Sequence, residues 1–499
     1  MRGRRTWGLV AGLALCALGV NVAASADSGL TGPTLPANDL EAMIGLAAGG
    51  LAPMKTPVVA PSPPLSSVPR ARCGAGSRPL AGMQGRVTQA DVDSAAAARG
   101  WTCNVAQVSR FATPGGWRVW RYRDPHGHTC VYYDTSFTAP ANIISVAGGP
   151  SLGVQVLDAA RPAALHHTAT LMSLAMLSPH ESLNLNARRG LLAAEVGNGL
   201  TLPGTFDVYD VRSDCRHPRL LAQRAIPTGH ESGFSPDGRT FWVAGGAGYI
   251  TAFDLTNPRQ PRQIWKGAYY AHGISVSADG RTIYQTDPIS GNLGLIDVSQ
   301  VQDRVANPQV HDISRITWPT VSVPQNSVPF TRNGHRYLAE FDEFAFRFNP
   351  ATIADKVGAA RIINIDHPSR PRIVANVRLA INMRANHVAA RSDPSPLGSM
   401  QVFGGAMHYC AVPTRDNPTI LVCSALTSGL RIFDIRNPAR PKEVGYFIAP
   451  PRAGHLLGLL PGDFATSQPA FDPAHRVVYY SDAGAGLYAV RLNRRAWPR

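Results

Sequence analysis

The sequence predicts an all-β protein: a seven-bladed β-propeller with a small N-terminal cap pinned by disulfides. Short Val/Ile/Leu/Tyr runs alternate with Gly, Pro, Asp and Asn, and few stretches show helical periodicity. The 499 residues include 47 Gly and 41 Pro without a collagen-like period, which is typical of many turns. One strand-and-turn motif also recurs along the chain, and such a repeat indicates a ring or array of equivalent units.

The recurring motif is a strand that ends in Asp, followed by a Pro-containing turn and a departing strand. Clear copies read "FDVYDVRSDCRHPRLLA", "ITAFDLTNPRQPRQI", "ARIINIDHPSRPRIV" and "LRIFDIRNPARPKEVG". A turn carboxylate accepts the backbone N–H two residues on, so we interpret these acids as structural. The spacing of roughly 40–70 residues suits one four-stranded blade per copy. The motif acid of successive copies falls at Asp158, Asp210, Asp254, Asp297, Asp366 and Asp434, with Arg491 in the seventh.

Each blade is read as a first strand, a hairpin, a second strand, a third strand ending in the motif, and a fourth strand. The hairpins "FSPDGRT" and "VSADGRT" contain Asp-Gly, which supplies the positive φ of a tight turn. The strand "CVYYDTSF" lies near the start of the ring and "GLYAVRLN" near its end. Both ends of the chain can therefore close the ring, and the sequence leaves open whether the N-terminal region supplies the last outer strand.

The motif copies resemble the LVIVD repeat of secreted β-propeller proteins. The stretch "MQGRVTQADVDSAAAARGWTCNVAQVS" before "CVYYDTSF" is similar to the N-terminal portion of secreted members of that group. The resemblance covers residues 73 to about 493. It implies the fold and export, but no particular activity.

The N-terminus predicts export. "MRGRR" is a basic n-region, "TWGLVAGLALCALGV" is an apolar h-region, and Ala24-Ser25-Ala26 is a small-x-small cleavage site. We therefore expect a signal peptide over 1–26, no transmembrane span, and a protein that is secreted, periplasmic or on the cell surface. The Ala/Pro-rich stretch 27–72 is predicted to be a linker, 73–116 a cap segment, and 117–499 the propeller. Within the cap, we expect a short helix with Thr88 as N-cap and Gly100 as its stop.

Six cysteines remain after the signal peptide, an even number that suits disulfides in an oxidising compartment. Cys410 and Cys423 flank a predicted hairpin, so we expect them to pair. Cys73, Cys103, Cys130 and Cys215 then share two bridges whose pairing stays open, and we expect the first three to pin the cap.

The formal net charge of +15 leaves two interpretations. One is attraction to an anionic partner such as a cell-wall polymer, a lipid or DNA. The other is an arginine-rich surface without a specific partner. The arginines are scattered over turns and are not interleaved with aromatic residues, so we expect no nucleic-acid partner. We expect a monomer whose ligand is a small molecule or an extracellular component.

Four histidines fall where blades begin with their innermost strand. The residues at that position are His180-Glu181, His230-Glu231, His272-Gly273, Asn326-Ser327, His408-Tyr409 and Gln468-Pro469. His180, His230, His272 and His408 should therefore converge near one end of the axis. Because side chains alternate along a strand, each His and its neighbouring Glu are expected to point in different directions.

Two functional hypotheses follow. The first is a binding or scaffold protein whose channel histidines and glutamates form a wet polar lining. The alternative is a metal-dependent oxidoreductase or hydrolase, in which the four imidazoles bind Cu, Zn or Fe. In that case Glu181 or Glu231 serves as general base or as the partner that orients a ligand.

Overall fold

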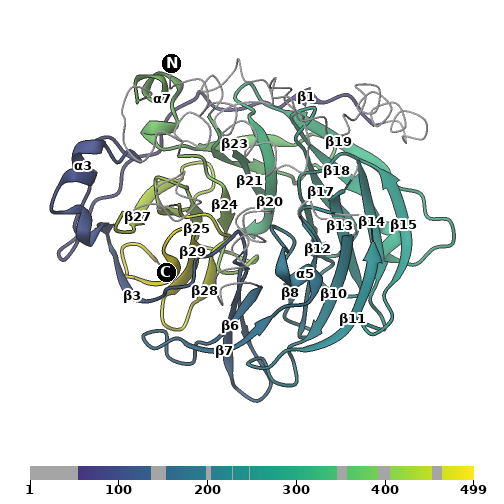
Figure 1. Ribbon diagram of the computed structural model, residues 1–499. Helices are drawn as coiled ribbons and strands as arrows, with labels where there is room; N and C mark the ends of the chain where they lie inside the picture. Colours follow the sequence, from purple (N-terminus) through teal and green to yellow (C-terminus); the bar gives the residue numbers. More distant parts are fainter. Residues whose placement is uncertain are drawn as a thin grey trace, which may run out of the picture.

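The chain forms a ring of antiparallel β-sheets whose innermost strands contact one another around a common axis (Figure 1). The computed structural model describes residues 54–135, 153–197, 204–226, 229–246, 248–344, 357–390, 405–451 and 464–498. Seven sheets are present in these ranges, which confirms the predicted all-β, seven-bladed propeller. The predicted signal peptide, 1–26, lies outside them. No helix within the described residues is long and apolar enough to cross a membrane.

In the first three blades, the strands follow the chain from the axis outward. Blade 1 consists of β4 (Val119–Arg123), β5 (Thr129–Tyr133), β6 (Val154–Asp158) and β7 (His166–Leu171). Blade 2 consists of β8 (Asn184–Asn186), β9 (Leu191–Glu195), β10 (Gly204–Asp210) and β11 (Arg219–Ile226). Blade 3 consists of β12 (Gly233–Phe234), β13 (Thr240–Gly246), β14 (Tyr249–Asp254) and β15 (Arg262–Ala268).

The remaining blades keep the same order, and three of them gain a strand from the N-terminal segment. Blade 4 consists of β16 (Ile274–Val276), β17 (Thr282–Asp287), β18 (Asn292–Asp297) and β19 (His311–Thr317). Blade 5 consists of β20 (Val323–Arg332), β21 (His335–Glu343), β22 (Ala360–Asn364) and β23 (Arg372–Val377). Blade 6 consists of β24 (Tyr409–Ala411), β25 (Ile420–Ser424), β26 (Leu430–Asp434) and β27 (Lys442–Ile448). Blade 7 begins with β28 (Ala470–Asp472), β29 (Val477–Asp482) and β30 (Gly486–Leu492).

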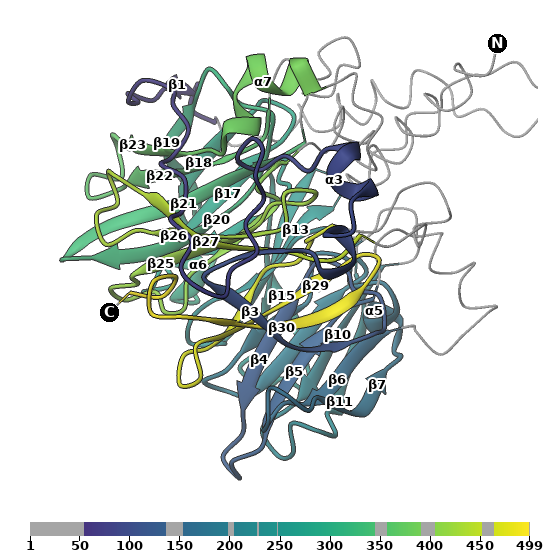
Figure 2. The ribbon, with the colours of Figure 1, turned by 90° about the vertical axis from the view of Figure 1, so that its left-hand side faces the viewer.

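The N-terminal segment runs along the outer edges of blades 4 to 7 (Figure 2). β1 (Val58–Val59) pairs in parallel with β19, and β2 (Trp101–Cys103) pairs with β27. β3 (Val105–Phe111) pairs with β30 and is the outermost strand of blade 7, so both ends of the chain close the ring. Between β1 and β2, α3 (Gln89–Asp93) begins after the N-cap Thr88, and a 3₁₀ turn, η1 (Ala97–Arg99), ends at Gly100. The other helices are short connections: α5 (Leu174–Leu177), α6 (Ser299–Gln302), η3 (Ala380–Asn382) and α7 (Arg384–Ala389).

The repeated turn works as predicted in five copies. Asp158, Asp210, Asp254, Asp297 and Asp434 each end a third strand, and a carboxylate oxygen of each accepts the N–H two residues later at 2.8–3.1 Å. The prediction is wrong for Asp366. Asn364 ends β22, pairs with Arg372 and accepts from the Asp366 N–H at 3.3 Å, because an amide oxygen replaces the carboxylate there.

The core lies between neighbouring blades. In one cluster, Tyr132 and Val156 of blade 1 pack with Leu192 and Tyr209 of blade 2. Complete burial of each such side chain contributes roughly 1.5–3 kcal/mol, so the blade interfaces hold the ring rigid around its axis.

All six cysteines of the described chain form disulfides. The predicted Cys410–Cys423 bridge is confirmed and joins register partners of β24 and β25. The other bridges are Cys73–Cys103 and Cys130–Cys215. The expectation that Cys130 helps to pin the cap is therefore wrong: it binds blade 1 to the turn after β10, where Tyr132 also donates to the Cys215 carbonyl at 2.8 Å.

Candidate metal centre

Four buried histidines lie in the connections that lead into innermost strands. His180 and His230 are in the turns before β8 and β12, His272 is two residues before β16, and His408 directly precedes β24. Since equivalent points of the blades face the axis, the fold brings these side chains to one end of it. The structure thus assembles the four predicted positions, which are separated by up to 228 residues in the sequence.

Three of the imidazoles share one orientation. The Nε2 atoms of His230, His272 and His408 face the same interior, and those of His230 and His272 lie 3.2 Å apart. Their Nδ1 atoms face acceptors instead: the Gly197 carbonyl at 2.9 Å, a Glu231 oxygen at 3.4 Å and the Thr466 carbonyl at 3.1 Å, respectively. His230 donates through Nδ1 to a backbone carbonyl and so leaves its Nε2 lone pair available, which is the arrangement of metal-ligating histidines. His408 Nε2 also contacts the Gln325 amide nitrogen at 3.3 Å, and His272 Nδ1 also lies 3.7 Å from Glu181.

Glu181 lies at the middle of the cluster. Its Oε2 is 3.2 Å from His230 Nε2, and its Oε1 is 3.7 Å from His408 Nε2 and accepts from Gln325 at 3.0 Å. Three sets of potential ligand atoms, each within 4.8 Å of one another, all contain this carboxylate. They are His180, Glu181 and His230; Glu181, Glu231 and His272; and Glu181, Glu343 and His408.

His180 and Glu181 do not show the expected alternation of neighbouring side chains. Both residues contribute to the same potential ligand set, although they are adjacent in the sequence. They lie in a turn before β8 starts at Asn184, and His180 has a φ of +50°, so the strand rule does not apply there. A positive φ at a residue other than glycine is sparsely populated and is concentrated at functional sites.

Glu343 belongs to the cluster but was not predicted from the sequence. It ends β21, the second strand of blade 5, and its Oε2 lies 3.2 Å from His272 Nε2 and 3.6 Å from His408 Nε2. A signal was present: "RYLAEFDE" carries three acids among Leu, Ala, Tyr and Phe. Gln325 was also missed, one residue before the predicted Asn326.

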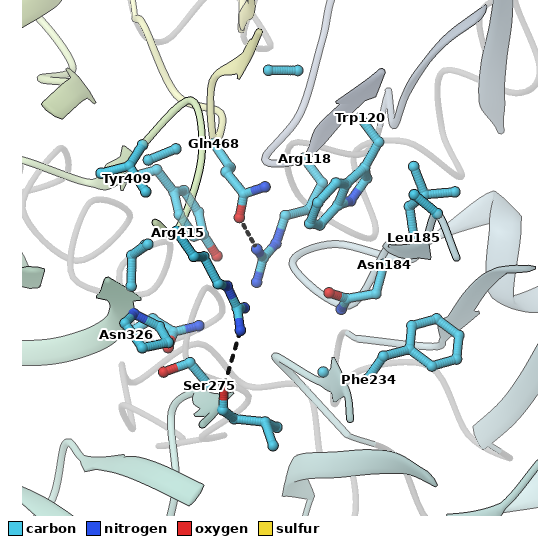
Figure 3. Close-up of a pocket in the computed structure, with 18 of the residues that line it drawn as sticks. Arg118, Trp120, Asn184, Leu185, Phe234, Ser275, Asn326, Tyr409, Arg415 and Gln468 are labelled. Carbon is cyan, nitrogen blue, oxygen red and sulfur yellow. Dashed lines mark hydrogen bonds between the residues drawn. The ribbon is translucent and has the colours of Figure 1, made fainter. Parts of the chain in front are cut away.

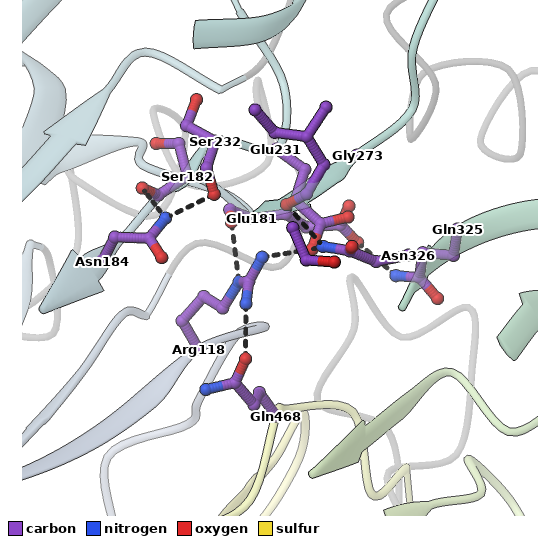
Figure 4. Close-up of polar contacts among 12 residues, drawn as sticks. Arg118, Glu181, Ser182, Asn184, Glu231, Ser232, Gly273, Gln325, Asn326 and Gln468 are labelled. Carbon is purple, nitrogen blue, oxygen red and sulfur yellow. Dashed lines mark hydrogen bonds and ion pairs between the residues drawn. The ribbon is translucent and has the colours of Figure 1, made fainter. Parts of the chain in front are cut away.

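Arg118 is the third omission, and it borders the cluster through its contacts with Glu181 and Glu231 (Figure 4). It precedes the innermost strand of blade 1, whose start the sequence analysis did not locate. Its guanidinium donates to the Glu181 carbonyl at 2.7 Å and to the Gln468 side chain at 2.6 Å, and it forms an ion pair with Glu231. This one side chain therefore connects blades 1, 2, 3 and 7.

Glu231 is held by these contacts. Arg118 and Asn326 both donate to its Oε1, while its Oε2 faces His272 Nδ1. Glu231 is therefore placed to orient the imidazole of His272, one of the two roles expected for it from the sequence. Glu181, which contacts Nε2 atoms, is better placed to act on a bound group.

The electrostatics of the cluster follow from three carboxylates beside one guanidinium. Burial alone would lower the pKa of His272, but the carboxylates of Glu181 and Glu343 outweigh it and raise that pKa well above its ordinary value. Burial would raise the pKa of Glu181, yet His272 and His230 hold it well below its usual range. Desolvation lowers the pKa of His180 to about 3, which keeps that imidazole neutral at physiological pH.

The distances fit ligands that share one ion. Two ligands about 2.0–2.1 Å from a metal, at tetrahedral or octahedral angles, lie roughly 2.9–3.4 Å apart. The His230–His272, His230–Glu181 and His272–Glu343 atom pairs are each 3.2 Å apart. The carboxylates of Glu181, Glu231 and Glu343 exceed the single charge of Arg118 by two, and a protonated His272 offsets only one of these charges. Because buried unpaired charges are costly, a divalent cation would offset this excess.

The comparisons with known proteins assign no family to this chain. No family model and no curated protein matches the chain. Among solved structures, it is similar to a Bacteroides fragilis protein described as a candidate 6-phosphogluconolactonase, at 10% identity and a TM-score of 0.48. That match covers 67% of this chain and 84% of the other. The resemblance to LVIVD-repeat proteins stays a prediction.

Proposed function

We propose that this protein is an exported metal-dependent enzyme whose centre is the axial cluster of His180, His230, His272, His408, Glu181 and Glu343. The observation that carries the proposal is the convergence of imidazoles on two carboxylates. The Nε2 atoms of His230 and His272 lie 3.2 Å apart and 3.2 Å from Glu181 and Glu343, respectively, and the Nε2 atom of His408 lies 3.6–3.7 Å from the same two carboxylates. A wet structural lining would not require Nε2 atoms of two histidines to meet at 3.2 Å beside two carboxylates.

The ligand set favours iron or zinc. Imidazole suits Zn, Cu and Fe, whereas carboxylates suit harder ions, so a mixed set favours Fe(II) or Zn(II) over Cu(I). A bound ion would supply Lewis acidity, which suits a hydrolase. Iron would also supply redox chemistry, so the identity of the metal distinguishes a hydrolase from an oxidoreductase. In this proposal Glu231 and the backbone carbonyls orient the imidazoles, and Glu181 is the residue closest to a proton-transfer role.

Three disulfides in the described chain and the predicted signal peptide support export, because disulfides persist in oxidising compartments. The protein for the test should therefore be purified from its export route. Elemental analysis is expected to find about one divalent ion per chain. The double variant His230→Ala/His272→Ala should lose it. The matched variant His311→Ala/His475→Ala, which changes two exposed histidines paired with Asp297 and Asp472, should keep it.

The enzymatic part of the proposal needs a turnover that is abolished by chelation and restored by the same metal. A wild-type protein that is folded and metal-free, with a melting temperature insensitive to added Fe(II) or Zn(II), would contradict the metal centre. It would favour the hypothesis of a binding or scaffold protein.

A further inference from the structure

A second candidate site lies next to the proposed metal centre, in the axial channel that the innermost strands line. A cavity of about 490 Å³ is lined by residues from all seven innermost strands and the turns that follow them. This volume is in the range of small-molecule sites, which are roughly 300–1,000 Å³. Arg118 and Asn326 form part of its wall, and the buried cluster lies behind them.

The cavity wall carries arginines without acids. Its lining includes Arg118, Arg121, Arg188 and Arg415, and no Asp or Glu. Two of these arginines form ion pairs with acids that do not line the cavity: Arg118 with Glu231, and Arg121 with Asp472 at 3.3 Å. Arg188 and Arg415 form no ion pair with any residue of the described ranges. The channel is therefore positive, and it draws negative ligands.

Arg415 is held so that it projects into the channel (Figure 3). Its backbone carbonyl accepts from Thr331 of β20 at 2.8 Å, and its Nη1 donates to the Val276 carbonyl at 3.0 Å. The side chain keeps contact with water in the channel, yet the surrounding walls desolvate the guanidinium and lower its pKa. An arginine fork fixed in this way, with donors left over, matches the two oxygens of a carboxylate or phosphate.

The rest of the wall mixes apolar and aromatic side chains with polar ones. Trp120, Phe234, Phe471, Val328 and Val412 all line the cavity. Polar side chains with hydrogen-bonding capacity, such as Asn184 and Ser275, are interspersed among them. Convergent apolar surface around one fixed charge is the composition of a site for a small molecule with a charged end.

We infer that the axial channel binds a small organic anion, with its carboxylate or phosphate on Arg415 and its apolar body against Trp120, Phe234 and Phe471. The site uses different side chains from the proposed metal centre, from which the Arg118 layer separates it. The inference also accounts for part of the net charge of +15, because some of the arginines that produce it line this cavity.

The test is titration calorimetry with three naphthalene probes of one size: 1-naphthoate, 1-naphthyl phosphate and the neutral 1-naphthalenemethanol. One of the anions should bind at least about ten-fold more tightly than the alcohol, because a charge-assisted bond to arginine is lost in the alcohol. Which anion binds more tightly identifies the natural head group as carboxylate or phosphate. Equal binding of all three, or no binding, would overturn the inference.

Variants locate the site. Arg415→Gln should weaken the anion by about ten-fold or more while leaving the alcohol unchanged, and Arg415→Lys should weaken it less. Arg259→Gln, an exposed arginine in the outer turn of blade 3, is the matched control and should bind as the wild type does. Chelation separates the two sites: binding that survives EDTA supports the channel. Binding that vanishes with the metal, or weakens equally in Arg259→Gln, would contradict it.

Discussion

His230 Nε2 lies 3.2 Å from His272 Nε2, at the axis and out of contact with bulk solvent. Two imidazole nitrogens at this distance need either a shared proton or a shared cation. The neighbouring carboxylates of Glu181 and Glu343 favour either, and the cluster geometry favours the cation.

Glu181 should matter more for metal binding than Glu231. Glu181 lies near His230 and His408 at Nε2 and near His272 at Nδ1, whereas Glu231 contacts only His272 among the four histidines, on its Nδ1 side. We expect Glu181→Gln to weaken the metal by more than ~100-fold and Glu231→Gln by ~10-fold, as for a ligand and for a residue that orients one. Competition with a chromogenic chelator measures both constants. The reverse order would show that the roles are exchanged.

Arg118→Gln should destabilise the protein, because it removes the guanidinium partner of the buried Glu231 carboxylate and leaves it only the Asn326 amide and the His272 ring. Breaking one side of such a pair costs about 3 kcal/mol or more. The double variant Arg118→Gln/Glu231→Gln should recover most of that loss, since no buried charge then lacks a partner. Urea unfolding of the two single variants and the double variant gives the coupling energy. Additive losses would mean that the pair does not interact.

Gly273 should not tolerate a side chain. A Cβ there would lie 2.3 Å from Glu231 Oε2 and 2.7 Å from the Gln325 carbonyl. Gly273→Ala should therefore cost about 1–3 kcal/mol and displace Glu231. Gly233→Ala in the next blade is the control, because its Cβ would meet only the Ile274 carbonyl at an ordinary 3.5 Å. Thermal unfolding should separate the two variants clearly, and equal melting temperatures would contradict the close approach.

Asp254 should stabilise its blade in a pH-dependent way. Burial would raise its pKa, but hydrogen bonds from Thr256 and the guanidinium of Arg304 lower it to about 2. A depressed carboxyl pKa stabilises the fold above pH ~4, and this contribution disappears as the pH falls toward 2. The Asp254 side chain is largely buried, but its guanidinium partners Arg262 and Arg304 are exposed and partly exposed, so solvent screens the pairing and we expect Asp254→Asn to cost only ~1 kcal/mol at pH 7.

This cost should reflect charge alone, because an asparagine keeps the turn acceptor, as Asn364 does in blade 5. Urea unfolding of Asp254→Asn and the wild type at pH 7, 4 and 2.5 should show the difference shrinking with acidity. A difference that is constant or grows at low pH would refute the assignment. Asp297→Asn, which lacks a guanidinium partner in the described structure but keeps the same turn bond, should cost less.

The sequence by itself determined the features that each blade specifies locally. The Asp-to-Pro turn depends on one side chain and a backbone N–H two residues away, so its copies were readable and their number predicted seven blades. Asn364 was missed because its amide oxygen, and not a carboxylate, accepts the backbone N–H in that copy. The bridge between Cys410 and Cys423 was readable for the same reason, since both cysteines belong to one hairpin. The histidines before innermost strands followed from the register of the repeat.

Only the tertiary structure decided which other side chains reach the axis and where. Arg118 arrives from blade 1 and Glu343 from the second strand of blade 5, neither of which the repeat marks as an axial position. The turn at His180 and Glu181 points both residues inward, against the alternation that a strand would impose. Closure by Val105–Phe111 was likewise undecided. Local patterns encode turns and registers, whereas the charge balance of a buried cluster depends on blades far apart in the chain.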